Sequence, residues 1–260
     1  MARAMLCEPY DYTILSATTA EAGTSSANLT NDEPGLVYRC NTTGAMSVEV
    51  DLGSAKAVGA IAWLGCPLYA GTRRFRGATS QANLTAAPGY DSGSIANIAF
   101  STNRTATLTK CLNVPSSLQT FRYWRIDLAP TGQKAEAWRF LVCGAMQPVE
   151  NIQIGAEFSV DDRSIRRYAR SGRRIIDPAN ILPAFQGEWP WITRSEYEAQ
   201  WRPFMIRGGA TKPALFILDS ADTTWGEDAI IYGDLEKSSK IVYNDGDVFG
   251  YNLAIVGIAP

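Results

Sequence analysis

The sequence predicts a mainly β chain that folds as two β domains with one short helix. Short runs rich in Val, Ile, Thr and aromatic residues recur along the chain, separated by clusters of Gly, Asn, Ser and Pro. Several runs alternate apolar and polar residues with a period of two, as a strand with one buried face does. Only residues 193–202 combine a helix start signal with helical spacing. The 260 residues suffice for two ordinary domains, which we expect at 1–146 and 147–260.

Residues 1–146 predict a β-sandwich. Val48, Val50 and Leu52 alternate with acidic residues, which indicates a strand with one buried face. Residues 57–64 are almost entirely apolar, as expected for a strand covered on both faces. The polar, turn-rich segments are expected to form loops at one end of the sandwich. These segments are 17–45 and 79–104, and the candidate strands are 13–16, 47–52, 57–64, 73–78, 105–108, 123–128 and 138–144.

The second domain is predicted to begin with an amphipathic strand and an Arg-rich hairpin. In residues 152–160 every second position is apolar, and the pair Asp161 and Asp162 follows. Six arginines and no lysine then occur within twelve residues, around the turn-forming pair Ser171 and Gly172. The arginines are Arg163, Arg166, Arg167, Arg170, Arg173 and Arg174. They give a concentrated cationic surface on a chain whose net charge is only −2.

The rest of the second domain predicts one helix and three more strands. Residues 177–190 contain Pro and Trp and are expected to be a connection. Thr193 fits a helix N-cap, with Glu196 completing a capping box, and Pro203 is expected to end the helix. Tyr197 and Trp201 lie one turn apart and should bury its inner face. Trp189, Trp191 and Trp201 are better explained as a packing cluster than as ligand-stacking residues. The later strands are 213–219, 229–235 and 248–258, with turns at 219–226 and 244–246.

Composition excludes most catalytic chemistry. The chain has no histidine, which removes Ser-His-Asp and Cys-His catalysis and most zinc sites, and it has no phosphate-binding glycine loop. A carboxylate-dependent hydrolase is the remaining enzyme class, but adjacent acids on a strand point to opposite faces and do not form a catalytic pair. Residues 244–247 (NDGD) favour a tight turn over a calcium loop. We therefore expect no enzyme, cofactor or metal site. The acidic pairs considered are Asp161/Asp162, Glu196/Glu198, Glu227/Asp228 and Asp245/Asp247.

Cysteine usage and hydropathy favour a protein made in the cytoplasm. The five cysteines are far apart and lie beside apolar residues, so buried reduced thiols are favoured over disulfides. The first residues lack the apolar stretch of a secretory signal. The longest uncharged run, 57–72, is shorter than the roughly 20 residues that a membrane helix needs.

The first domain resembles the discoidin, or galactose-binding-like, family. The resemblance rests on an ordered set of motifs: LTNDEPGLVYRC (29–40), VEVDLGSAKAVGAIAWLG (48–65), RRFRGATS (73–80), FRYWRIDL (121–128) and AWRFLVCGAM (137–146). It implies a jelly-roll sandwich and, through loops at one end, binding of a host-surface glycan. The residues that would bind it are Asp32, Tyr38, Arg39, Tyr69, Arg73 and Tyr90. The alternative is that these side chains cap the sandwich or contact a neighbouring subunit.

The second domain resembles the distal-tail and tube-like domains of long-tailed bacteriophages. The matching pieces, in order, are residues 150–160, 163–176, 193–202, 213–219, 232–235 and 248–258. The resemblance implies a structural protein of the phage tail tip: a virion component that forms a ring, a hexamer rather than a trimer, between the tail tube and the hub. Its partners would be copies of itself and the tail-tube, tape-measure and hub proteins. Unlike the simplest distal-tail proteins, this chain places the sandwich before the ring-forming domain.

The Arg-rich hairpin is interpreted as a subunit interface. A solvated face would leave its six like charges unneutralised, and a nucleic-acid surface would be isolated in an otherwise acidic half of the chain. Identical subunits arranged head to tail place a positive patch of one against a negative patch of the next. The acids considered as its partners are Asp219, Asp222, Glu227, Asp228, Asp234 and Glu236.

Overall fold

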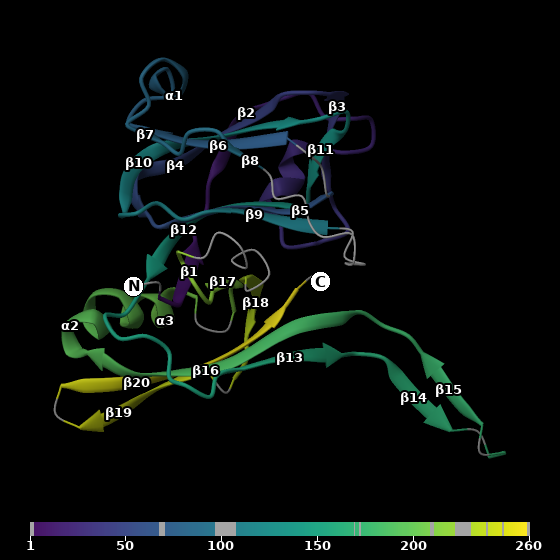
Figure 1. Ribbon diagram of the computed structural model, residues 1–260, viewed down its shortest axis with the longest axis vertical. Helices are drawn as coiled ribbons and strands as arrows, with labels where there is room; N and C mark the ends of the chain where they lie inside the picture. The colour runs from purple at the N-terminus through teal and green to yellow at the C-terminus, as the bar shows by residue number, and fades with distance from the viewer. Residues whose placement is uncertain are drawn as a thin grey trace. The chain divides into compact units, whose positions relative to one another are not determined.

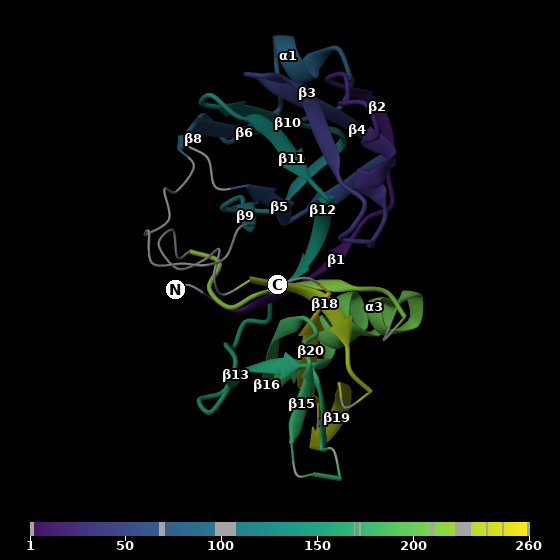
Figure 2. The ribbon, with the colours of Figure 1, turned by 90° about the vertical axis from the view of Figure 1, so that its right-hand side faces the viewer.

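A computed structural model describes residues 3–67, 71–96, 108–168, 170–171, 173–208, 211–221, 230–237, 239–245 and 247–258 (Figures 1 and 2). The chain forms two compact units. The amino-terminal unit consists mainly of Cys7–Ala145. The carboxy-terminal unit consists of Met1–Leu6, Met146–Asp219 and Ile230–Pro260. The first six residues therefore belong to the same unit as the second half of the chain. The expected division into 1–146 and 147–260 placed them in the first domain. Each unit has its own core and is described by itself.

The amino-terminal unit is a jelly-roll β-sandwich (Figure 2). One layer has the strand order β2-β4-β10-β6-β7, with β8 also paired to β6, and the other includes β12-β5-β9. The bounds are β2 Thr13–Ala17, β4 Met46–Val58, β5 Ala60–Pro67, β6 Gly71–Ala78, β7 Tyr90–Asp91, β8 Ile95–Ala96, β9 Leu108–Asn113, β10 Gln119–Pro130 and β12 Arg139–Met146. A small sheet joins β3 (Tyr38–Thr43) to β11 (Lys134–Ala137), and short helices lie at Ser26–Thr30 and Asn83–Ala86. The chain enters this unit along β1 (Met5–Pro9).

The alternating residues of 48–52 that were predicted to be buried do face the core of the sandwich. Val48 and Val50 of β4 and Trp124 of β10 are fully buried, together with Trp63 and Phe140 of the facing layer. The register pairs Trp124 with Val50 across the β4–β10 ladder. Residues directly opposite each other in an antiparallel pair share a face, so the intervening charged residues share the outer face.

The carboxy-terminal unit is built on one antiparallel sheet with the strand order β13-β16-β20-β18-β17, and β19 pairs with β20 (Figure 1). A separate two-stranded ribbon, β14–β15, follows β13 along the chain. The bounds are β13 Glu157–Asp162, β14 Ile165–Tyr168, β15 Arg174–Asp177, β16 Ile181–Thr193, β17 Ala214–Ile217, β18 Ile230–Leu235, β19 Lys240–Asp245 and β20 Val248–Gly257.

One face of this sheet packs on the helical segment and forms the core. Trp189 of β16 and Tyr251 of β20 are fully buried, and the Trp201 ring centroid lies 4.5 Å from that of Tyr251. The rings of Phe185 and Phe216 stack at 4.2 Å between centroids. The expected packing cluster therefore forms around Trp189 and Trp201. Trp191 lies outside it and is exposed.

The helix starts where the sequence predicts but does not end there. Thr193 caps it and shares a capping box with Glu196, as expected. The expectation that Pro203 ends the helix is wrong, because helix α3 (Arg202–Arg207) continues past it. Between α2 (Arg194–Glu196) and α3 lies a π-helical turn, Tyr197–Trp201. Such a turn re-routes the backbone hydrogen bonds, and Pro203 stands in the first turn of α3, where an N–H is not required.

The expectation that residues 177–190 form a connection is also wrong, because residues 181–193 form the long strand β16. Its two prolines occupy positions that tolerate them. Pro183 precedes the first residue paired with β20, and Pro190 lies within a register shift between Trp189 and Ile192. Proline is accepted in sheets at strand starts and at such irregularities.

Strand β13 is shorter and more exposed than the alternation of residues 152–160 predicts. Gly155 has a φ of +105°, a left-handed conformation suited to glycine, and the strand begins only at Glu157. Ile152 packs against the core, whereas Ile154 is fully exposed and Val160 is 67% exposed. The apolar face that the sequence predicts as buried is therefore largely open.

The fold class predicted from the sequence is confirmed: the chain is mainly β, with the jelly-roll sandwich first and one short helical segment in the second half. Four described cysteines (Cys7, Cys40, Cys111 and Cys143) are buried and in no disulfide, as expected. In the described part of the chain, no helix combines the length and apolar character needed to span a membrane.

Candidate functional site

The Arg-rich segment forms a projecting ribbon, here called the arginine arm (residues 163–177). Strands β14 and β15 pair only with each other in the described chain, and Figure 1 shows the ribbon extending beyond the ends of β13 and β16. Its base is fixed by the backbone N–H of Ala179, which donates to Ser164 Oγ at 3.1 Å. Asp162 Oδ1 accepts from the Ser164 N–H at 3.0 Å. The predicted hairpin is present, and its residue Gly172 lies outside the described residues.

Most described arginines of the arm are exposed and have no carboxylate partner among the residues that the structure describes. Arg163, at its base, pairs with Asp161 at 2.9 Å. Further out, Arg167, Arg170, Arg173 and Arg174 are exposed, and no ion pair joins them to any described residue. Of Arg166 only the backbone is described, paired with Ile176. These four side chains place positive charge along the arm, and the interface role expected of the six arginines stays a prediction.

The arm also exposes apolar side chains. Tyr168 is 73% exposed and lies opposite Arg174, and Ile175 lies opposite Arg167. An isolated two-stranded ribbon is only marginally stable in water. Mixed apolar and cationic faces on such a ribbon are typical of a surface that contacts another protein.

Three of the six acids expected to receive the arm lie among the described residues. Asp234 is exposed on β18, while Asp219 and Glu236 already have interactions of their own. The remaining expected acids, Asp222, Glu227 and Asp228, lie outside the described residues.

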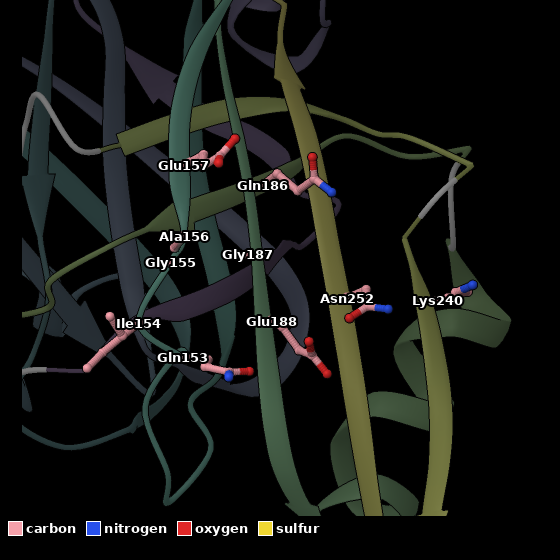
Figure 3. A pocket seen from close by; sticks show the side chains of 10 residues that line it. All are labelled: Gln153, Ile154, Gly155, Ala156, Glu157, Gln186, Gly187, Glu188, Lys240 and Asn252. Carbon is pink, nitrogen blue, oxygen red and sulfur yellow. The ribbon is translucent and has the colours of Figure 1, made fainter.

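The open face of the carboxy-terminal sheet carries a hollow that sequence analysis missed (Figure 3). Its volume is about 580 Å³, and Glu188 of β16 and Glu157 of β13 are its acidic side chains. The hollow was missed because residues 177–190 were expected to be a connection. The alternation of Gln186, Gly187 and Glu188, read as a strand, would have placed two polar side chains on one face. The lining residues are Gln153, Ile154, Gly155, Ala156, Glu157, Gln186, Gly187, Glu188, Lys240 and Asn252.

The expected glycan-binding residues of β3 and its preceding loop are engaged within the sandwich. Tyr38 is fully buried, and its hydroxyl donates to the Thr18 carbonyl at 2.7 Å. Burial raises the pKa of this hydroxyl well above its ordinary value. Arg39 is partly exposed and pairs with Glu136, and Asp32 pairs with Arg139 at 3.2 Å. Tyr38 therefore has no ring face to offer a sugar.

The remaining expected glycan-binding residues lie on other elements. Arg73 is buried on β6, where its guanidinium donates to the Leu112 carbonyl at 3.4 Å. Tyr90 is half-buried on β7, and its hydroxyl accepts from Asn113 Nδ2 at 2.8 Å. Tyr69 lies outside the described residues. The five described residues are thus spread over several elements and mostly serve the packing of the sandwich.

The outer face of the β4–β10–β6 layer carries a network of ion pairs. Arg125 bridges Glu49 at 2.6 Å and Asp127 at 2.8 Å, and Asp127 also accepts from Arg76. Burial raises the pKa of Glu49, but hydrogen bonds from Gln81 and Arg125 outweigh it and hold the pKa below its usual range. A hollow of about 280 Å³ lies beside Arg125 and Asp127 and is also lined by Arg74. The guanidinium groups of Arg74 and Arg125 and the carboxylate of Asp127 therefore line one surface hollow.

Within the described residues, no group of three or more His, Cys, Asp or Glu side chains is placed to hold a metal ion. Burial raises the pKa of the Cys7 thiol, and the neighbouring Cys143 raises it further. A thiol with a raised pKa is a poor nucleophile and a poor metal ligand.

Comparisons with solved structures find carbohydrate-binding proteins. The chain is similar to a family 32 carbohydrate-binding module from NanJ of C. perfringens in complex with galactose, at 14% identity and a TM-score of 0.40, over 54% of this chain and 99% of that one. It is similar to a fucolectin from striped bass, Morone saxatilis, at 14% identity and a TM-score of 0.40, over 94% of this chain and 90% of that one. The likeness is one of fold.

A third similar structure is the lectin-binding domain of lectinolysin complexed with Lewis b, at 12% identity and a TM-score of 0.36, over 52% of this chain and 93% of that one. No protein-family model matches the sequence, and no curated protein matches it.

Proposed function

We propose that this chain is an architectural protein that assembles with copies of itself through the arginine arm, as a component of a phage tail tip. One observation carries the proposal: a ribbon attached only at its base exposes both guanidinium groups and apolar side chains. Neither feature stabilises the subunit that carries it, because like charges repel and exposed apolar surface is unfavourable in water. Both are stabilising when a second surface covers them.

The proposed role is a ring of copies that joins the tail tube to the hub. Its support is the order of elements in the carboxy-terminal unit, which shares a strand, an Arg-rich ribbon, a capped helix and later strands of one sheet with the resemblance to distal-tail and tube-like domains. The unit also has the long strand β16 between the ribbon and the helix, and four strands, β17 to β20, follow the helix. Identical subunits that meet through two different surfaces close into rings when the rotation allows it.

The test is the mass of the assembled full chain in solution. We expect a discrete oligomer of three or six copies by sedimentation and light scattering at micromolar concentration. A variant in which residues 164–178 are replaced by Asn-Gly should be a monomer with an unchanged far-ultraviolet spectrum, because β14 and β15 pair only with each other. A wild-type chain that stays monomeric contradicts the proposal. In purified virions, antibodies against the chain should label one end of the tail, and absence of the chain from virions contradicts the tail-tip role.

Saccharide binding by the amino-terminal unit is the second candidate function. The observation that favours it is the hollow beside Arg74, Arg125 and Asp127, because planar charged groups suit the paired hydroxyls of a sugar. The full chain applied to a glycan array tests it, with Arg74→Gln expected to remove any signal and leave the oligomer intact. Arg202→Gln, which changes an exposed arginine of helix α3, is the matched control. No signal on the array rules this candidate out.

A further inference from the structure

The hollow on the open sheet face is a preformed acidic site. Its wall, residues 151–156, is anchored by Ile152, which packs against the core, and by the backbone N–H of Gln153, which donates to the Glu188 carbonyl at 2.7 Å. An ideal Cβ at Gly187 would stand 2.6 Å from Ile152 Cδ1, so the glycine permits this close approach. The wall is therefore held in place before any partner binds.

Two carboxylates of the hollow have no cationic partner among the described residues. Glu188 and Glu157 come from adjacent strands, and no ion pair or side-chain hydrogen bond engages either carboxylate. Figure 3 shows Gln186 next to Glu157, Asn252 beside Glu188 on the side away from β13, and Lys240 farther along, on β19. Lys240 supplies one positive charge against two negative ones, so the lining keeps a net negative charge. Ile154, fully exposed, adds apolar surface at the rim.

The arm of the same copy does not reach this hollow. Glu157 is the first residue of β13, and the arm leaves from its far end. At about 3.3 Å per residue, the thirteen residues from Glu157 to Arg170 span up to roughly 43 Å when extended, and Figure 1 shows the arm continuing away from β13. Any contact between the arm and the hollow therefore joins two copies.

We infer that the arginine arm of one copy docks into the acidic hollow of the next, with guanidinium groups meeting Glu157 and Glu188 and Tyr168 or Ile175 covering Ile154. The inference deepens the assembly proposed above and rests on it. The sites complement each other in charge: on one side are exposed arginines and on the other carboxylates, neither with an ion-pair partner in the described part of the chain. A guanidinium fork binds a carboxylate through two parallel hydrogen bonds, which an ammonium group does less well.

This contact is heterologous, because each copy offers a different surface to each neighbour. A copy with a damaged arm can still receive an arm, and a copy with a damaged hollow can still donate one. Mixing copies whose arm is deleted with copies whose hollow is damaged therefore allows a single productive contact and gives a dimer. An interface that uses the same surface on both copies does not produce this outcome.

The experiment uses charge reversal in the full chain, read by sedimentation velocity. Arg170→Glu with Arg173→Glu reverses the arm, and Glu157→Arg with Glu188→Arg reverses the hollow. We expect each pair of changes alone to weaken self-association at least tenfold. Their equimolar mixture should recover the oligomer, because the reversed arm of one copy meets the reversed hollow of the other. The arm-deletion variant mixed with the hollow reversal should give only a dimer. The chain that carries all four changes should recover the oligomer. Arg202→Glu and Glu33→Lys, which change exposed side chains of helix α3 and of the amino-terminal unit, are the controls and should leave association unchanged.

The outcomes separate this inference from the proposed function. If deletion of the arm abolishes the oligomer while reversal of the hollow leaves it intact, the arm assembles the protein but docks elsewhere, and the inference is overturned. If deletion of the arm leaves the oligomer intact, the assembly role of the arm fails as well. Unchanged circular dichroism and urea midpoints for every variant exclude misfolding as the cause.

Discussion

Replacing Glu196 with alanine tests how the helix of the carboxy-terminal unit is fixed to the chain that enters that unit. The Glu196 carboxylate accepts three hydrogen bonds: from the Thr193 backbone N–H at 2.8 Å, from Thr193 Oγ1 at 2.7 Å, and from the Val149 N–H at 2.8 Å. A helix cap contributes about 0.5–2 kcal/mol and one further hydrogen bond about 1 kcal/mol. Glu196→Ala should therefore lower the free energy of unfolding by about 2–3 kcal/mol.

The assay is urea denaturation of the full chain, combined with hydrogen exchange of the Val149 and Thr193 amides. The matched control is Glu198→Ala, two residues further along the helical segment. Glu198 makes only an exposed pair with Arg194 at 3.0 Å, so its loss should cost under about 1 kcal/mol. Equal costs for the two variants, or unchanged exchange of the Val149 amide in Glu196→Ala, would refute the reasoning.

The same carboxylate gives a pH dependence with a defined sign. Burial raises the pKa of Glu196, but the hydrogen bonds from Thr193 and Val149 outweigh it and hold the pKa below the ordinary value of 4.5. A carboxyl whose pKa is lowered by folding contributes stability above its unfolded pKa and loses it as the pH falls through its folded pKa. The stability difference between wild type and Glu196→Gln should be constant from about pH 7 to 5 and shrink below about 4.5. A difference that grows toward acid pH would contradict the assignment.

Three further outcomes are expected. Trp201→Ala should lower the free energy of unfolding by about 3–5 kcal/mol, because it empties a fully buried site against Trp189 and Tyr251; thermal denaturation measures it. Raising the salt from 0.15 to 1 M should weaken self-association, because the screening length falls from about 8 to 3 Å; sedimentation velocity measures it. The thiols of Cys7 and Cys143 should react with a thiol reagent only after unfolding, because burial removes them from solvent and raises the pKa of both; a rapid reaction of the native chain at either would contradict this.

The sequence predicted elements whose side chains alternate or carry a local signal. Val48 and Val50 face the core, and Thr193 with Glu196 forms the expected cap, because these patterns depend only on neighbouring residues. Strand β16 could not be predicted in this way. Pro190 is compatible with a strand only because the register shifts beside it, and that shift is defined by pairing with β20, a strand distant in sequence.

The arginine arm and the acidic hollow also differ in whether neighbouring residues alone could predict them. The arginine arm was predictable, because its six arginines lie within twelve consecutive residues and repel one another unless another surface neutralises them. The hollow was not, because Glu157 and Glu188 are 31 positions apart by their numbering and become neighbours only through the β13–β16 register.

The residues expected to bind a saccharide show that sequence alone does not reveal which side chains are exposed. Tyr38 and Arg73 have the right chemistry for sugar recognition, but residue type does not reveal exposure, and the structure buries both. Residues of this kind are commonly used to complete the packing of a sandwich, and here the Tyr38 ring meets Trp63 edge-on at 6.2 Å. The arm has the opposite character, since its exposed groups gain nothing from their own subunit. Exposed charge and apolar surface together, with no ion-pair partner for the outer arginines among the described residues, are the observation on which the proposed assembly rests.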